Sequence, residues 1–186
     1  MNRIFLGLAA LPLMGMAPSG GMVVSLGESA ARSCYEAART NSRLATAIAA
    51  CNKAIRYEAL DRRDLVATHV NRSILYMVHR NYSDAEVDLN RAVTLDPNQP
   101  DAWLNFAIAH YQQGKMESAS TMFERAITLR TQHPALAYYG RALVKEDTGD
   151  VQGAYADLKR ATELKPSWAA PANELKRFRV VRKVGG

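Results

Sequence analysis

A pattern of two amphipathic helices joined at a glycine restricts the fold of this chain more than any other feature, because the pattern recurs. Its best copy runs from Asp101 to Arg130, with the glycine at Gly114. A glycine between two helical patterns ends the first helix, since only glycine adopts a left-handed backbone at little cost. The residues at helical spacing are Trp103, Phe106, Ala107, His110 and Tyr111 before the glycine, and Met116, Ala119, Phe123, Ala126 and Ile127 after it. Such a hairpin cannot bury its apolar faces alone, so it needs neighbours of the same kind.

The second helix of this pattern occurs four times. Each copy has two small residues seven positions apart, with a larger residue four positions after the first. Two small residues two turns apart let a neighbouring helix approach closely, and the larger side chain fills the remaining gap. Prolines at Pro97 and Pro166 close two of the copies, because proline lacks the backbone donor that would continue a helix. The copies are Ala47, Cys51 and Ala54; Ala85, Leu89 and Ala92; Ala119, Phe123 and Ala126; and Ala154, Leu158 and Ala161.

A period of 34 residues, an early tryptophan, a glycine at the turn and the series of alanine, large apolar residue, alanine and proline resemble the tetratricopeptide repeat (TPR) family. The resemblance covers about residues 28–168, in repeats at about 28–61, 66–99, 100–133 and 135–168. It implies an all-α fold, a right-handed superhelical solenoid of about four helical hairpins. The first repeat departs most from the family, with Ser42 at the turn and Ala59 in place of the proline. The alternative is an ordinary helical bundle with chance periodicity.

The N-terminus has the pattern of an export signal. Arg3 is followed by an apolar run of 14 residues from Ile4 to Ala17, which is typical of a secretory signal and shorter than the roughly 20 residues of a membrane span. We expect residues 1–21 to be a signal peptide, with cleavage as late as residue 25, and residues 22–27 to be a loose linker. The mature protein is then periplasmic or secreted, and of a bacterial type. The alternative is an uncleaved anchor in the inner membrane.

The two cysteines, Cys34 and Cys51, lie on either side of the expected first turn near residues 41–43. In an antiparallel helix pair, residues equally far from the turn face each other, so this spacing allows a disulfide across the first hairpin. Export would supply the oxidising compartment that the bond requires. The alternative is two buried free cysteines that act as small apolar side chains.

The family resemblance also implies a binding surface, because the first helices of TPR repeats line a concave groove. Asn71 and Asn105 stand where TPR grooves often hydrogen-bond a peptide backbone, and an amide both donates and accepts. The alternative is that asparagine is simply a common residue at this repeat position. Carried over by position, the groove consists of Val70, Asn71, Ile74, Met77, Leu104, Asn105, Ile108, Gln112, Tyr139 and Leu143.

One function known in the family is disfavoured. TPR proteins that bind chaperone tails hold the terminal carboxylate with two lysines, two asparagines and an arginine. Of these five positions only Asn105 fits, and Val70, Ile74, Leu136 and Gly140 occupy the others. Without cations the groove cannot hold a terminal carboxylate in that way. We therefore expect the ligand to be an apolar peptide or a helix of a partner protein.

Catalytic motifs do not stand out in the sequence. The four histidines are scattered, and none has a cysteine or carboxylate at metal-ligand spacing in the sequence. The glycines at Gly114 and Gly149 suit turns rather than a phosphate loop. We expect a non-catalytic protein–protein interaction scaffold, not an enzyme, with no cofactor and no metal. The partner is a protein or peptide that the sequence does not identify.

The C-terminal segment, residues 169–186, is expected to form a basic capping helix and tail. Pro171 suits the first turn of a helix, while Leu175 and Phe178 would cover the last repeat. The formal net charge is +6, and much of it comes from this end of the chain. An alternative function is therefore attachment to an anionic membrane or cell-envelope component; export argues against a nucleic-acid partner. The basic patch consists of Lys176, Arg177, Arg179, Arg182 and Lys183.

Overall fold

The computed structural model describes residues 29–40 and 44–178, and within these residues it contains nine α-helices and no strand. The expected signal peptide and linker, residues 1–27, lie outside the described residues, as do Arg179, Arg182 and Lys183 of the basic patch. No helix of the described chain is both long and apolar enough to cross a membrane. The all-α helical repeat fold predicted from the periodicity is confirmed.

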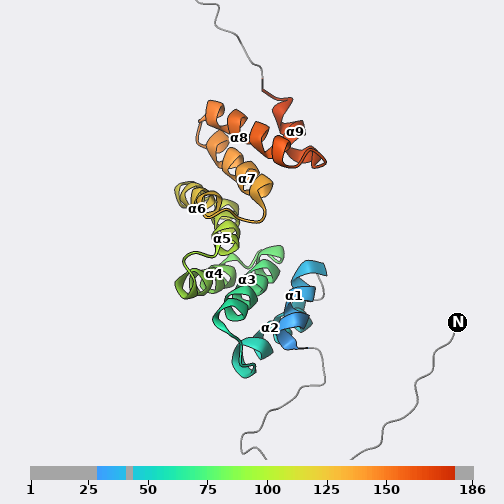
Figure 1. Cartoon of the computed structure of the whole chain (residues 1–186). Helices are drawn as coiled ribbons and strands as arrows, with labels where there is room; N and C mark the ends of the chain where they lie inside the picture. Colours follow the sequence, from blue (N-terminus) through green and yellow to red (C-terminus); the bar gives the residue numbers. More distant parts are fainter. Residues whose placement is uncertain (1–28, 41–43, 179–186) are drawn as a thin grey trace, which may run out of the picture.

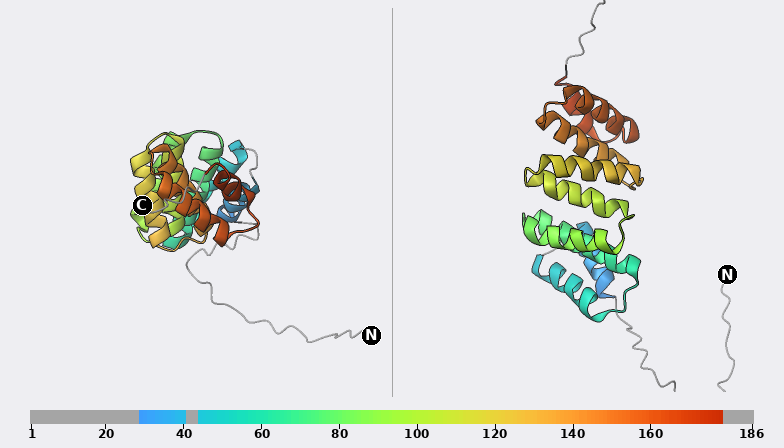
Figure 2. Two further views of the ribbon diagram at one scale, coloured as in Figure 1. Left: turned by 90° about the horizontal axis from the view of Figure 1, so that it is seen from above. Right: turned by 90° about the vertical axis from the view of Figure 1, so that its left-hand side faces the viewer.

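Eight of the helices form four antiparallel hairpins, and a short ninth helix follows them (Figure 1). The first helices of the hairpins contact one another in series, and the hairpins follow one another along a single stack (Figure 2). The hairpins are α1 (Ala30–Thr40) with α2 (Leu44–Tyr57), α3 (Arg62–Val78) with α4 (Tyr82–Leu95), α5 (Pro100–Gln112) with α6 (Met116–Thr128), and α7 (Pro134–Asp147) with α8 (Val151–Leu164); the last helix is α9 (Ala169–Leu175).

The turns of three hairpins place one residue in the left-handed backbone region. Gly114 and Gly149 have φ values of 74° and 89°. The corresponding residue of the second hairpin is Arg80, with φ of 58°, and Arg130 after α6 has φ of 61°. A residue with a Cβ atom is strained by about 1–2 kcal/mol in this conformation, so the two arginines weaken their connections.

The small–large–small series of the second helices forms the core. Ala119, Phe123 and Ala126 on α6 are at most 1% exposed, and the corresponding residues of α4 and α8 are equally buried. Gly140 on α7 completes this packing, because a Cβ atom there would overlap the ring of Phe123. The glycine therefore lets α7 lie close against α6.

The second hairpin is closed by a buried carboxylate. Asp88 on α4 receives hydrogen bonds from Arg72 on α3, at 2.7 Å from Nε and 2.5 Å from Nη2, and lies 2.9 Å from Nδ1 of His69. Burial of Asp88 raises its pKa, but the hydrogen bonds from Arg72 and His69 outweigh burial and hold the pKa below its usual range. The guanidinium of Arg72 also donates to Asn52 on α2 and so connects two hairpins.

The fourth hairpin repeats this arrangement at the equivalent positions, two hairpins further along the stack. Arg141 on α7 donates two hydrogen bonds of 2.8 Å to Asp157 on α8, and Nζ of Lys145 lies 2.9 Å from the same carboxylate. In the third hairpin, the positions of Arg141 and Asp157 are taken by Phe106 and Met122, which contribute to one apolar cluster. The same site between paired helices is therefore filled by an ion pair in two hairpins and by apolar side chains in another.

The first helix is held at its start by a residue from the far end of its hairpin. The carboxylate of Glu58, just after α2, accepts hydrogen bonds from the backbone N–H groups of Ala30 at 2.6 Å and Ala31 at 3.0 Å. A carboxylate is stabilised at a helix N-terminus by the unpaired N–H groups and the helix dipole. Glu58 therefore closes the hairpin formed by α1 and α2.

Candidate functional site

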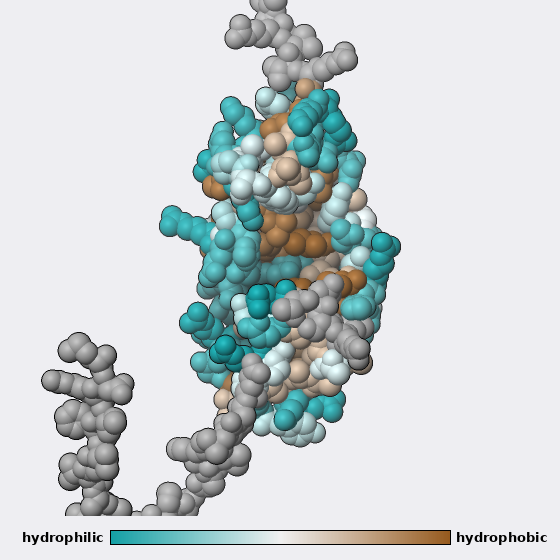
Figure 3. Space-filling view, turned by 90° about the vertical axis from the view of Figure 1, so that its right-hand side faces the viewer, coloured by the Kyte–Doolittle hydropathy of each residue, from teal (hydrophilic) through white to brown (hydrophobic). Residues whose placement is uncertain are grey.

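The first helices of the hairpins form a face whose middle is hollowed and apolar, with hydrophilic side chains at its flanks (Figure 3). Its N-terminal half contains a hollow of about 550 Å³, lined by α1, α3, the start of α5 and the connection between α6 and α7. We call it the amide hollow because Asn71, Gln99, Asn105 and Gln132 all line it. Four predicted groove residues lie in its wall, namely Val70, Asn71, Ile74 and Asn105.

The two asparagines of the amide hollow differ in their hydrogen bonding. The amide nitrogen of Asn105 donates to the backbone carbonyl of Asp101 at 2.8 Å, which leaves the side-chain oxygen as an acceptor. The amide of Asn71 makes no hydrogen bond within the described chain, so both its donors and its acceptor remain for a ligand. The hollow can therefore hydrogen-bond an entering backbone from α3 and from α5.

Two charged side chains line the amide hollow, Asp101 and Arg39. Arg39 pairs with Glu36 one turn earlier on α1, at 2.9 Å. Asp101 accepts a hydrogen bond from the hydroxyl of Thr131, a buried residue of the connection between α6 and α7. The backbone N–H of His133 donates to the same hydroxyl at 3.1 Å, so the Thr131 side chain is fixed from two sides.

A second hollow, of about 420 Å³, adjoins the amide hollow at the connection between α6 and α7. We call it the tryptophan hollow: Leu136 of α7, Leu164 of α8 and Trp168 line it, and it shares Gln132 and His133 with the amide hollow. The Trp168 ring is held edge-on against Tyr139, with ring centroids 4.9 Å apart. The two hollows thus adjoin, one rich in amides and the other apolar.

The prediction that Leu104 belongs to the groove is wrong. Its side chain is 1% exposed and packs in the core with Phe123 and Ala137, because α7 covers this side of α5. Other predicted groove residues are partly buried or exposed on the first helices but do not line either of these two hollows. These residues are Met77, Ile108, Gln112, Tyr139 and Leu143.

Several residues of the hollows were not predicted from the sequence. Tyr35 of α1 is 50% exposed in the wall of the amide hollow, and Ala67 of α3 lines the same hollow. The prediction carried over residues only from the first helices of the second to fourth repeats. Tyr35 belongs to the first repeat, which matches the family least. Gln132 and His133 lie in a connection, which has no position on a first helix.

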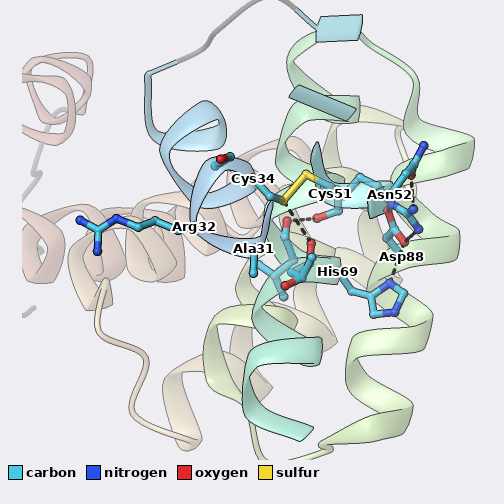
Figure 4. The surroundings of a disulfide bond; sticks show 12 residues. Ala31, Arg32, Cys34, Cys51, Asn52, His69 and Asp88 are labelled. Atoms are coloured by element: carbon cyan, nitrogen blue, oxygen red, sulfur yellow. Dashed lines mark hydrogen bonds and ion pairs between the residues drawn. A yellow bond between two sulfur atoms is a disulfide. The ribbon is translucent and has the colours of Figure 1, made fainter. Parts of the chain in front are cut away.

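The disulfide supports the helix that carries Tyr35. In the structure Cys34 of α1 is bonded to Cys51 of α2, both sulfur atoms are inaccessible, and the Cα atoms are 4.8 Å apart (Figure 4). Asn52, the residue after Cys51, accepts a hydrogen bond from Arg72, so α2 connects the disulfide to the ion pair of the second hairpin (Figure 4). The position of α1, one wall of the amide hollow, thus depends on this cross-link.

The basic patch lies only partly within the described chain. The last helix, α9, ends at Leu175, before the basic residues, and Lys176 and Arg177 follow it in a turn. Nη2 of Arg177 lies 2.7 Å from Glu146 and 2.6 Å from Glu174, so this guanidinium is already paired. No group of His, Cys, Asp and Glu side chains within the described residues is placed to hold a metal ion.

Comparison with known proteins identifies the repeats. Two tetratricopeptide repeat models match residues 79–144 and 135–167. No curated protein sequence matches the chain significantly. Among solved structures, MamA is 25% identical over 74% of this chain and 77% of its own, with a TM-score of 0.63. MamA from Desulfovibrio magneticus RS-1 is 17% identical over 81% of this chain and 84% of its own, with a TM-score of 0.65.

A third structure is the first TPR domain of Spaghetti (RPAP3) bound to the HSP90 peptide SRMEEVD. It is 22% identical over 63% of this chain and 92% of its own, with a TM-score of 0.59. At this identity the likeness concerns the fold. The repeat period, the four stacked hairpins and the matches of both family models lead to one conclusion: the chain is a tetratricopeptide repeat protein.

Proposed function

We propose that the protein is a non-catalytic scaffold that binds a segment of a partner protein on the face formed by its first helices. One observation carries this proposal: the amide hollow and the tryptophan hollow adjoin and share Gln132 and His133. Together they offer hydrogen-bonding groups for a backbone and an apolar recess for a side chain, which is the combination that peptide-binding grooves use.

The structural neighbours support the class of function and differ in the ligand. The RPAP3 domain is bound to a peptide, and that peptide ends in Glu-Glu-Val-Asp. In this chain Val70 and Ile74 line the hollow where cations would be needed for such a ligand, and Gly140 packs against Phe123 instead of reaching the groove. An acidic peptide tail is therefore not the ligand that we propose.

We also propose that the protein acts after export, in the periplasm or outside the cell. The support is the positive start and apolar run at the N-terminus, together with a disulfide that an oxidising compartment would maintain. Attachment to an anionic envelope surface through the basic patch has less support, because Arg177 already pairs with Glu146 and Glu174.

The test is affinity capture from a native envelope extract with a variant that fills the amide hollow. Ala67 is exposed in that hollow, so Ala67→Trp should block it without disturbing the core. Ala156→Trp, at an exposed position on α8, is the matched control and carries the same cost in helix propensity. We expect a protein retained by wild type and by the control to be lost with Ala67→Trp.

A captured protein that Ala67→Trp still retains would contradict binding in the groove. If that retention also disappears in high salt, the basic patch is the working surface, because screening weakens exposed charge interactions much more than apolar contacts.

A further inference from the structure

We infer that the bound segment is extended and carries a lysine or arginine side chain that pairs with Asp101 in the amide hollow. This inference rests on the proposed function and specifies its ligand. It reverses the charge of the ligand expected for a TPR groove that binds acidic tails.

Asp101 is the unbalanced charge of the amide hollow. Among the described residues that line it, only Asp101 and Arg39 are charged, and Arg39 pairs with Glu36 at 2.9 Å. No cation of the described chain pairs with Asp101, whose side chain receives only the neutral hydroxyl of Thr131. A carboxylate in a partly enclosed recess attracts a cationic side chain more strongly than one in open solvent does.

The carboxylate of Asp101 is oriented before any ligand arrives. Thr131 holds Oδ1, and the N–H of His133 in turn holds the Thr131 hydroxyl at 3.1 Å, which leaves Oδ2 without a hydrogen bond in the described chain. Asp101 also lies in the first turn of α5. A fixed acceptor loses little conformational entropy when a cation binds.

The lining amides favour an extended segment over a helix. A helix satisfies its own backbone N–H and C=O groups, so it has little to offer to Asn71, Gln99 and Gln132, whereas an extended chain presents free groups along its length. The adjoining tryptophan hollow is apolar at Leu136 and Trp168. A ligand that enters both hollows therefore has a cationic side chain and, a few residues away, an apolar one.

The competing explanation is that Asp101 is purely structural and ties α5 to the connection at Thr131. Asp101→Asn separates the two roles, because asparagine keeps an oxygen that accepts from the Thr131 hydroxyl but has no charge. Glu117→Gln, an exposed position on α6, is the control for the loss of one negative charge elsewhere. Unchanged circular dichroism and urea midpoints would show that each variant keeps its fold.

The experiment uses a library of random dodecapeptides displayed on phage, selected against the full chain. We expect wild type to enrich sequences with a lysine or arginine near an aliphatic or aromatic residue, and Ala67→Trp to lose them. A synthetic peptide of the enriched sequence should bind Asp101→Asn about five- to tenfold more weakly, the loss expected for one charge-assisted pair. Glu117→Gln should bind it as wild type does.

A charge reversal gives the sharper test. A peptide in which glutamate replaces the cationic residue should bind wild type more weakly than the original peptide does. The same glutamate peptide should bind the Asp101→Lys variant more tightly than it binds wild type. If Ala67→Trp loses the peptides but they lack a cation, or Asp101→Asn binds them unchanged, the inference is wrong and the proposed function stands. If Ala67→Trp retains every enriched peptide, the groove is not the binding site and both fail.

Discussion

The ion pair of the fourth hairpin should be replaceable as a pair but not one partner at a time. Arg141 is 18% exposed and Asp157 only 7%. Arg141→Phe leaves a buried carboxylate with Lys145 as its remaining cation, so we expect a loss of about 2–3 kcal/mol in unfolding free energy. Asp157→Met should cost about 1–2 kcal/mol, because both cations can turn toward water. The double variant should lie within about 1 kcal/mol of wild type, since Phe106 and Met122 already fill this site in the third hairpin.

The assay is urea unfolding followed by circular dichroism. Midpoints and slopes are compared among wild type, the two single variants and the double variant, which together form a double-mutant cycle. The control is the exposed pair of Arg160 and Glu163, which lie 3.2 Å apart on one face of α8. Arg160→Phe and Glu163→Met should be additive within about 0.5 kcal/mol. A double variant at the buried pair whose loss equals the sum of the two single losses would refute the reasoning.

The same cycle predicts a pH dependence. Burial of Asp157 raises its pKa, but hydrogen bonds from Arg141 and Lys145 outweigh burial, so the pKa in the folded protein lies below the ordinary value. A lowered folded pKa contributes stability that is present above the unfolded pKa of about 4 and is lost as pH falls through the folded value. The Arg141→Phe/Asp157→Met variant lacks this contribution and should lose less stability than wild type between about pH 5 and pH 3. Equal losses in urea titrations across this range would contradict the assignment.

Three further predictions concern the backbone and the cross-link. Cys34→Ala/Cys51→Ala should lower the unfolding free energy by about 3 kcal/mol, the chain-entropy value for a loop of this size, and a reductant should then have no further effect on urea unfolding. Arg80→Gly should raise the unfolding free energy by about 1 kcal/mol, because glycine relieves the strain of the left-handed backbone. An unchanged urea midpoint would argue against strain at this turn. Gly140→Ala should lower the unfolding free energy by about 1–3 kcal/mol through overlap with Phe123, and Phe123→Leu in the same chain should return part of that loss if overlap is the cause.

The sequence pattern was sufficient to predict the helical hairpins. The spacing of apolar residues within each segment predicts a helix, and the recurrence of the pattern at a fixed period predicts that the hairpins stack. The small–large–small series, for example, placed Phe123 correctly in the core. Leu104 was misplaced because its neighbour on the adjoining helix, not its own repeat position, determines whether it is covered. The carboxylate of Glu58 at the start of α1 was missed for a related reason: the bonded groups are 28 residues apart and share no motif.

Residues at the connections were the least predictable part of the candidate site. Gln132 and His133 belong to no helical pattern, yet both hollows include them. The left-handed conformation of Arg80 was also hidden, since arginine carries no sequence signal for it, whereas the glycine at the same turn in the third hairpin does. Helical faces can be derived from spacing, but what covers or fills a hollow depends on contacts between repeats.

The closure of the first hairpin has a consequence for the order in which the chain folds. Its disulfide spans a separation of 17 residues, and the hydrogen bond that the N–H of Ala30 donates to Glu58 spans 28. Contacts this short in sequence form quickly and need nothing from the rest of the chain. In an oxidising compartment, α1 and α2 can therefore close without the rest of the chain and present an apolar surface, on which Leu75 of α3 then packs.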